Sequence, residues 1–359
     1  MKIVIAGLGV IGASLALAVK QVHKDYLISG YDLPDVLDFA EKNKIIDRRI
    51  KNWPQGAVDA DLIVLSTPLA IIKKQLDELN NVVDKNTVVT DTGSTKSELA
   101  EYAESINFSG TYIGGHPMTG SEKSGISAAN PLLFQNALYI LCGISEDNER
   151  QVKNILFPVL EAVKARVFMM DARTHDKVLA GISHLPQLVA VALVNYVGQQ
   201  QEELNYPFFE LAAGGFRDLT RIASSSISIW QDIINSNREN VVAALKQFID
   251  TLENEKQAVS DLSQIFETAN NYRSRVPKET KGFLYPLVDI LVYVKDEVGV
   301  ISKIANKLFE ENIDIRDIEL LKIREKEGGV FRLSLNSREE AVKAAELMNT
   351  LNYRAFIRE

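Results

Sequence analysis

Lys2-Ile3-Val4-Ile5-Ala6-Gly7-Leu8-Gly9-Val10-Ile11-Gly12 is the most informative segment of this sequence. Its first five residues predict a buried strand, and the apolar residues after Gly12 predict a helix. In this strand–turn–helix context Gly7 allows a tight turn, Gly9 lets a pyrophosphate approach the backbone, and Gly12 lets helix and strand pack closely. The free N–H groups of the helix N-terminus then favour an anion. The segment therefore predicts a dinucleotide-binding loop.

An acidic residue completes this candidate site. Asp32 follows the predicted strand Tyr26–Tyr31. A carboxylate there accepts hydrogen bonds from ribose hydroxyls and repels a 2′-phosphate, which favours NAD over NADP. The turn Ser66-Thr67-Pro68, which follows another strand, is expected to line the same cleft. A glycine-rich turn of some other α/β protein, with Asp32 as a solvated strand end, is the alternative.

Residues 1–145 alternate between short apolar runs and helical patterns, which is typical of a doubly wound sheet. The runs lack period-two alternation, as expected of parallel strands buried on both faces. Strands are expected at Lys2–Ala6, Tyr26–Tyr31, Asp61–Leu65, Thr87–Thr90, Tyr112–Gly114 and Ala137–Leu141, and helices at Ile11–Val22, Val36–Asn43, Leu69–Leu79 and Lys96–Ser105. We therefore predict an α/β protein with an N-terminal Rossmann-type domain.

Residues 146–272 show no strand signal and predict an all-helical domain. Helices are expected at Glu149–Lys164, Arg173–Gln200, Phe208–Ala223, Ile227–Asn235 and Asn237–Asn270. The part Leu185–Val197 is apolar almost all round, which predicts burial on every side. Because so small a domain has little else to cover this helix, we expect a homodimer formed here.

The C-terminal part predicts a separate small domain. Residues 273–285 have the charge and proline content of a linker. In residues 286–359, strands are expected at Leu287–Val294, Ile315–Arg324, Gly329–Leu335 and Tyr353–Arg358, and helices at Val300–Glu311 and Glu339–Leu351. The order βαββαβ is the ferredoxin-like plan.

Composition excludes several classes of function. The 359 residues carry a net charge of −8, so we expect neither a nucleic-acid partner nor a membrane surface, although a local pocket for a small anion is allowed. The single cysteine, Cys142, rules out a disulfide framework. No uncharged apolar run is expected to reach the roughly 18 residues of a membrane span, and a strand from Lys2 leaves no room for a signal peptide. We expect a cytoplasmic protein without a bound metal.

One histidine lies where doubly wound folds carry out their chemistry. Gly114-Gly115-His116-Pro117 follows a predicted strand, at the carboxyl edge of the sheet. The loop after the preceding strand carries Ser94, which is expected close to His116. The histidine could then accept a substrate proton while the hydroxyl orients its ring. A purely structural turn for His116, and a helix cap for Ser94, are the alternatives. Surface positions are predicted for His23 and His175.

A cationic cluster lies in the helical half. Arg217, Asp218 and Arg221 are spaced so that both arginines share a helix face and Asp218 is within reach of Arg221. An arginine held by a carboxylate can still bind a second carboxylate, so the cluster is a candidate substrate clamp. A surface ion pair is the alternative.

Together these motifs resemble the prephenate dehydrogenase family, NAD-linked enzymes of tyrosine biosynthesis, in the form with a C-terminal ACT domain. The match is carried by Gly7–Gly12, Asp91–Lys96, Gly115–Glu122, Ser183–Pro186, Gly214–Asp218 and Thr220–Ser224. These segments follow the family's order over nearly the whole chain. The glycine loop is common to many dehydrogenases, whereas the His-Pro loop combined with Gly-Gly-Phe-Arg-Asp is more specific.

The resemblance implies oxidative decarboxylation of prephenate to 4-hydroxyphenylpyruvate. His116 would draw off the proton of the ring hydroxyl as hydride leaves for the nicotinamide, and Ser94 would orient His116. Arg221 matches the arginine that grips a substrate carboxylate, with Asp218 beside it. Further pocket positions are matched by Ser121, Glu122, Ser183 and Trp230.

The sequence departs from the family at one pocket position. Many relatives have a second histidine where Ser183-His184-Leu185-Pro186 is followed by Gln187. Glutamine offers a donor and an acceptor but does not titrate. The choice between prephenate and its amino counterpart arogenate therefore stays open. His184 itself is either a pocket residue or a buried helix residue.

The C-terminal segment fits the ACT pattern, which implies domains that pair edge to edge and hold an amino acid between them. Asp296, Gly299 and Asn312 lie in the loops that would line such a site, with tyrosine as the effector. A domain that only assists dimerisation is the alternative. For the whole chain, the alternatives are a β-hydroxyacid dehydrogenase with Lys177 as its catalytic lysine, and a non-catalytic sensor of NAD and amino acids.

Overall fold

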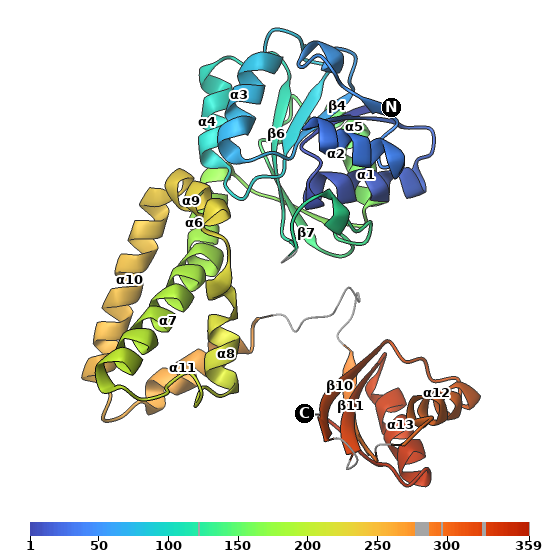
Figure 1. Ribbon diagram of the computed structural model, residues 1–359, viewed down its shortest axis with the longest axis vertical. Helices are drawn as coiled ribbons and strands as arrows, with labels where there is room; N and C mark the ends of the chain where they lie inside the picture. The colour runs from blue at the N-terminus through green and yellow to red at the C-terminus, as the bar shows by residue number, and fades with distance from the viewer. Residues whose placement is uncertain (121–122, 277–286, 296, 325–327, 359) are drawn as a thin grey trace. The chain divides into compact units, whose positions relative to one another are not determined.

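The computed structural model describes residues 1–120, 123–276, 287–295, 297–324 and 328–358. The chain forms two compact units, residues 1–266 and 267–359. Figure 1 shows both, with the first unit built from a sheet-containing half and a helical half. The predicted linker 273–285 lies mostly outside the described residues.

The first unit contains a sheet whose described strands follow the order β3-β2-β1-β4-β5-β6-β7-β8. Their bounds are β1 Lys2–Ala6, β2 Leu27–Tyr31, β3 Arg48–Arg49, β4 Leu62–Leu65, β5 Val88–Asp91, β6 Thr111–Pro117, β7 Leu138–Cys142 and β8 Arg166–Met169. Neighbouring strands run parallel except β6 and β7, which are antiparallel. The doubly wound sheet is thus confirmed, with one antiparallel pair that the apolar pattern did not predict.

Helices cover both faces of this sheet (Figure 1). Their bounds are α1 Val10–Val22, α2 Pro34–Lys42, α3 Leu69–Leu79, α4 Ser97–Ser105 and α5 Glu149–Ala162. One hydrophobic core holds side chains of α1, α2 and α5, and another holds side chains of α3 and α4. Each face of the sheet therefore has its own core.

Strand β8 and helix α5 correct the expected layout. Residues 146–272 contain a strand after all, and α5 packs in the same core as α1. Strand β8 carries the apolar residues Val167, Phe168 and Met169, but so short an apolar run does not by itself distinguish a strand from a helical segment. The sheet-containing half thus continues to Met169, beyond the boundary expected at residue 145.

The helical half begins at residue 172. Its elements are α6 Ala172–Leu179, a π-helical turn Ala180–His184, α7 Leu185–Leu204, α8 Gly214–Thr220, a 3₁₀ turn Arg221–Ser224, α9 Ile227–Ser236 and α10 Arg238–Gln257. Helix α11, Ser263–Arg273, spans the boundary between the two units. The expected helix Asn237–Asn270 is broken in two. Asp261 accepts hydrogen bonds from the backbone N–H and hydroxyl of Ser263, which starts a new helix there.

Helix α7 is only partly buried within one chain. Only Gln187 and Ala190 of α7 are buried. The stretch Ala172–Leu204 is long and apolar enough, by length and composition alone, to cross a membrane, and 28% of its most apolar window is buried. This corrects the expectation that no run reaches that length. The predicted burial on every side is not met within one chain, so a covering partner stays a prediction.

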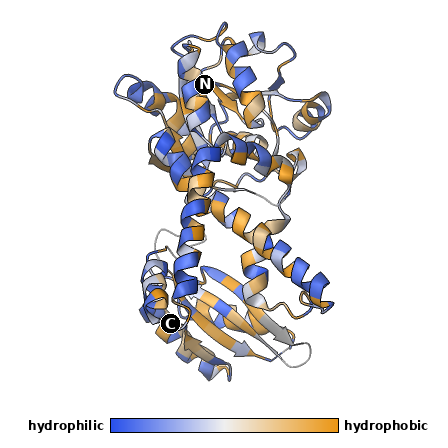
Figure 2. Ribbon diagram, turned by 90° about the vertical axis from the view of Figure 1, so that its left-hand side faces the viewer, coloured by the Kyte–Doolittle hydropathy of each residue, from blue (hydrophilic) through white to orange (hydrophobic). Residues whose placement is uncertain are grey.

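The second unit has the predicted ferredoxin-like order. Its elements are β9 Val288–Val294, α12 Val300–Glu310, β10 Asp317–Arg324, β11 Gly328–Leu335, α13 Arg338–Thr350 and β12 Arg354–Ile357. The sheet order is β10-β11-β9-β12, with antiparallel neighbours. In Figure 2 these strands carry mainly hydrophobic residues, and Ile290, Ile304, Leu333 and Met348 form part of a core with both helices.

Candidate active site

The glycine loop has the shape that a pyrophosphate requires. Gly7 has φ +95°, and a Cβ there would lie 2.4 Å from the carbonyl oxygen of Ser66. A Cβ on Gly12 would lie 2.0 Å from the carbonyl oxygen of Gly7, whereas a Cβ on Gly9 would have nothing within 4 Å. Helix α1 starts at Val10, and no side chain caps it, so the N–H groups of its first turn are available to bind an anion. The open side at Gly9 therefore fits a dinucleotide phosphate.

Asp32 and the Ser66–Pro68 turn adjoin this loop. The carboxylate of Asp32 accepts hydrogen bonds from the backbone N–H groups of Leu8 and Leu33, each at 2.6 Å. Ser66 follows β4, the parallel neighbour of β1, and its hydroxyl lies 2.9 Å from that of Thr92. These contacts hold the predicted cofactor residues at one edge of the sheet.

His116 lies near the end of β6 and is 9% exposed. Its Nδ1 lies 2.8 Å from Nε2 of His175, and Nδ1 of His175 lies 2.7 Å from Oδ1 of Asp176. The prediction that His175 lies at the surface is wrong, because its exposed fraction is 0%. Helix α6 contacts α4, and its Leu179 packs against β7. The face of α6 that carries His175 is buried by this packing.

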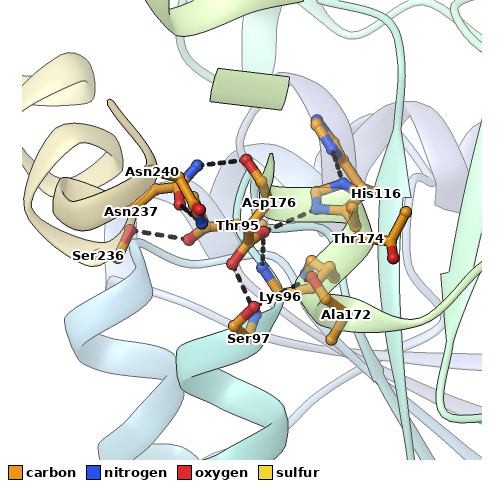
Figure 3. A network of polar contacts seen from close by, with 12 residues as sticks. Thr95, Lys96, Ser97, His116, Ala172, Thr174, Asp176, Ser236, Asn237 and Asn240 are labelled. Carbon is orange, nitrogen blue, oxygen red and sulfur yellow. Dashed lines mark hydrogen bonds and ion pairs between the residues drawn. The ribbon is translucent and has the colours of Figure 1, made fainter. Parts of the chain in front are cut away.

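Asp176 joins the two halves of the first unit. It accepts hydrogen bonds from the backbone N–H groups of Lys96 and Ser97, both at 2.8 Å, where α4 begins (Figure 3). Burial opposes its ionisation, but the hydrogen bonds from His175, Ser97 and Lys96 outweigh burial and lower its pKa. The carboxylate is thus ionised and acts as an acceptor only.

Asn237 extends this network. Its Nδ2 lies 2.7 Å from the carbonyl oxygen of Asp176 and 3.2 Å from Nδ1 of His184. His184 is buried, which lowers its pKa to about 4, and its ring meets Trp230 edge-on at 6.0 Å between centroids. His184 is thus buried, with one edge against Trp230, a predicted pocket residue.

His116 itself is a neutral imidazole. Burial is the largest cause that lowers its pKa well below the usual value, and the charge of Lys96 lowers it further. Lys96 forms a fully buried ion pair with Asp91. Asp91 also accepts a hydrogen bond from the hydroxyl of Tyr112 at 2.7 Å. At neutral pH the site therefore offers a proton acceptor beside a fixed pair of charges.

Ser94 does not have the contact that the sequence suggested. It is half-buried in the loop after β5, and among the described residues the partner of His116 is His175. The alternative role of a helix cap is also wrong, since α4 has Lys96 at its N-cap position without a side-chain cap. The carboxylate of Asp176, from another helix, takes that role.

The cationic cluster lies on two elements rather than one. Arg217 and Asp218 lie within α8, whereas Arg221 opens the 3₁₀ turn, and all three are exposed within one chain. Gln187 is buried on α7 and donates a hydrogen bond at 3.0 Å to the carbonyl oxygen of Ile222. The amide of Gln187 therefore holds the turn that carries Arg221.

Other predicted residues are placed as follows. Ser183 is half-buried in the π-helical turn, Lys177 is exposed on α6, and Ser121, Glu122 and Asp296 lie outside the described residues. Among the described residues, no three His, Cys, Asp or Glu side chains are grouped to hold a metal ion.

In the second unit, Gly299 and Asn312 lie before and after α12. Gly299 lines a pocket of about 230 Å³ with Val294 and Phe331, whereas Asn312 lines a different pocket with Phe309. The two residues thus do not share a pocket within one chain.

His175, Asp176 and Asn237 were not among the predicted site residues. One signal was present: His175 and Leu179 are four residues apart on a helix, so they share a face, and Leu179 is apolar. The charged neighbours of His175 concealed this pattern. No signal in the sequence indicates that Asn237 would meet Asp176.

Comparison with known proteins agrees with this arrangement. Residues 15–169 match the model described as prephenate dehydrogenase, nucleotide-binding domain, and residues 171–268 match the one described as prephenate dehydrogenase, dimerization domain. A prephenate dehydrogenase of Bacillus subtilis (strain 168) is 36% identical over 353 residues, which cover 96% of this chain and 94% of that protein.

Two solved structures are similar to the chain. The prephenate dehydrogenase of A. aeolicus, in complex with hydroxyphenyl propionate and NAD⁺, is 29% identical with a TM-score of 0.68, over 77% of this chain and 98% of that one. The arogenate dehydrogenase of Synechocystis is 28% identical with a TM-score of 0.69, over 77% of this chain and 100% of that one. From the two matching domains and the near full-length relative, the chain belongs to the prephenate dehydrogenase family.

Proposed function

We propose that the protein oxidises and decarboxylates prephenate to 4-hydroxyphenylpyruvate with NAD⁺, and that His116 accepts the proton. The observation that carries this proposal is the buried, neutral imidazole of His116 at the same sheet edge as the glycine loop. Family membership supports the reaction, and the A. aeolicus structure was solved with NAD⁺ and an aromatic acid.

The cofactor residues fit NAD. The open side at Gly9 and the free N–H groups at the start of α1 suit the pyrophosphate, and Asp32 suits the ribose hydroxyls. Bound there, NAD⁺ supplies the hydride acceptor. The proposed contacts are those of Gly7, Leu8, Gly9, Val10, Ile11, Gly12, Asp32, Ser66, Thr67 and Pro68.

The protein's share of the chemistry is proton removal and substrate orientation. The ring hydroxyl gives its proton to His116 while the C–H bond of the same carbon breaks and its electrons leave as hydride. The ring carboxylate then departs as CO₂, its bonding electrons complete the aromatic ring, and the ring oxygen takes a proton back from His116 to become the phenol hydroxyl. Burial keeps His116 unprotonated, so it is ready to accept at neutral pH.

Substrate binding is assigned to the helical half. Arg221 would bind a substrate carboxylate, with Arg217 and Asp218 beside it. Gln187 supports this clamp through the carbonyl of Ile222. The remaining proposed pocket residues are Ser94, Ser121, Glu122, Ser183 and Trp230.

Arogenate is the second candidate substrate. It shares the reacting ring and carboxylate with prephenate and differs in carrying an ammonium group in place of the keto group. The similarity to the Synechocystis arogenate dehydrogenase favours testing it. Gln187, which cannot titrate, lies where this choice would be made.

We also propose a homodimer and a regulatory C-terminal domain. The partly exposed apolar residues of α7 lie within the segment that matches a dimerization domain, which supports a partner there. The ferredoxin-like order of the second unit supports an ACT domain that binds tyrosine, with Gly299 of one chain and Asn312 of another lining the site. Tyrosine inhibition that is weakened by Asn312→Ala would support this effector site.

The test is formation of NADH by the full-length protein with prephenate and with arogenate, each offered separately. We expect turnover of prephenate, and a loss of about 10²-fold or more in kcat for His116→Asn with NAD binding unchanged. Turnover of arogenate alone would move the proposal to the second candidate. A protein that binds NAD and turns over neither substrate would contradict both and favour a sensor.

A further inference from the structure

A buried chain of three side chains ends on the proposed proton acceptor. It runs from Asp176 through His175 to His116, with contacts of 2.7 and 2.8 Å, and its members are 1%, 0% and 9% exposed. The two imidazole rings meet edge-on, with centroids 5.0 Å apart and planes at 66°. This geometry points one ring nitrogen of His175 at each neighbour.

The hydrogen-bond roles along this chain follow from its acidic end. An ionised carboxylate only accepts, and Asp176 already receives the N–H groups of Lys96 and Ser97. Nδ1 of His175 must therefore carry a proton and donate a hydrogen bond to Asp176. In an uncharged His175, Nε2 is then left with its lone pair.

The donor and acceptor in the contact between the two histidines follow from this lone pair. An unprotonated Nε2 on His175 accepts a hydrogen bond, so Nδ1 of His116 must be the donor. A neutral His116 that is protonated on Nδ1 has its lone pair on Nε2. That nitrogen is then free to accept a proton from a substrate.

We infer that His175 and Asp176 are positioning residues that hold His116 in the tautomer with an unprotonated Nε2. The inference rests on the proposed function, in which His116 is the proton acceptor. When His116 becomes protonated, the negative charge of Asp176 lies two hydrogen bonds away and stabilises the positive charge on the imidazole.

Two substitutions of His175 separate positioning from packing. His175→Gln keeps an amide oxygen near the place of Nε2, with the amide nitrogen toward Asp176, so it can hold the same tautomer. His175→Phe keeps an aromatic ring but offers His116 no acceptor. We expect kcat to fall about 10- to 100-fold in His175→Phe and to stay within about 5-fold of the wild type in His175→Gln.

Thr95→Val is the matched control. The hydroxyl of Thr95 lies 2.8 Å from that of Ser236, so this partly buried contact also joins the sheet half to the helical half, without touching His116. Its loss should lower thermal stability but leave kcat and the KM for substrate unchanged. The affinity for NAD should be unchanged in all three variants.

The tautomer is also measurable without turnover. The chain has only four histidines, so the full-length protein labelled with ¹⁵N-histidine gives a resolvable set of long-range ¹H–¹⁵N correlations. We expect His116 to be protonated on Nδ1 in the wild type and in His175→Gln.

Three results would overturn the inference. The first is a wild-type His116 protonated on Nε2, as a charged, donating His175 would produce. The second is a kcat of His175→Phe within 2-fold of the wild type, and the third is an equal loss of kcat in His175→Phe and His175→Gln. Absence of turnover in the wild type would instead contradict the proposed function, while the spectrum would still decide the tautomer.

Discussion

Removing the buried cation of Lys96 gives the sharpest prediction about stability and chemistry together. Lys96 and Asp91 form an ion pair in which both side chains are 0% exposed. Lys96→Met keeps most of the side-chain volume and leaves the carboxylate of Asp91 buried without its counter-charge. Breaking a buried pair in this way costs about 3–5 kcal/mol.

The remaining contacts of Asp91 set where in that range the loss falls. Asp91 keeps hydrogen bonds from the backbone N–H of Gly93 at 2.7 Å, the hydroxyl of Tyr112 at 2.7 Å and the N–H of Gly115 at 3.3 Å. We therefore expect a loss near the low end, about 3 kcal/mol in the free energy of unfolding measured with urea. The double variant Asp91→Asn/Lys96→Met should recover part of it, because no buried charge is left unpaired.

A more exposed ion pair, between α3 and α4, is the control. Lys73 and Glu98 lie 2.7 Å apart with side chains 34% and 43% exposed, so Lys73→Met should cost less than about 1 kcal/mol. The positive charge of Lys96 also lowers the pKa of His116, second to burial. In Lys96→Met that pKa should rise, so the acid limb of the pH–kcat profile should move to higher pH. A stability loss no larger than that of Lys73→Met, or an unmoved acid limb, would refute this reasoning.

Three further predictions concern single residues. Asp32→Asn should weaken NAD binding and reduce discrimination against NADP, as calorimetric titration with each nucleotide would measure; unchanged discrimination would place the ribose elsewhere. Arg221→Ala should raise the KM for prephenate about 10-fold or more with a smaller effect on kcat, because it removes a carboxylate clamp, and an unaltered KM in steady-state kinetics would move the clamp. His184 has its pKa lowered to about 4 by burial, so it contributes stability above its unfolded pKa near 6.5 that is lost as the pH falls toward 4. His184→Gln should flatten the pH dependence of urea unfolding between pH 6.5 and 4, and a slope equal to that of the wild type would contradict the assignment.

The parts of the fold that sequence analysis predicted are those whose signal is local. The loop from Gly7 to Gly12 carries its turn, its phosphate approach and its helix start within a few consecutive residues. His116 was found for the same reason, since its glycine and proline neighbours are consecutive in the sequence, although they lie in β6 and not in the predicted turn. The ferredoxin-like order of the second unit follows from apolar periodicity alone.

The parts that were missed depend on contacts between distant segments. His175 is buried because α6 packs against α4 and β7, far away in sequence. Strand β8 has a place in the sheet only because β7 offers it an edge. The apolar surface of α7 shows that a helix can be apolar without being buried in its own chain, because burial also depends on neighbours that one sequence does not show.

The most direct test of the proposed reaction is its stoichiometry. Prephenate labelled with ¹³C in the ring carboxylate would be supplied with excess NAD⁺ to the full-length protein, with NADH followed by absorbance and labelled CO₂ by mass spectrometry. We predict one NADH and one labelled CO₂ for each prephenate consumed, with both lost together in His116→Asn. NADH without labelled CO₂, or CO₂ release that does not depend on NAD⁺, would contradict a coupled oxidation and decarboxylation at this site.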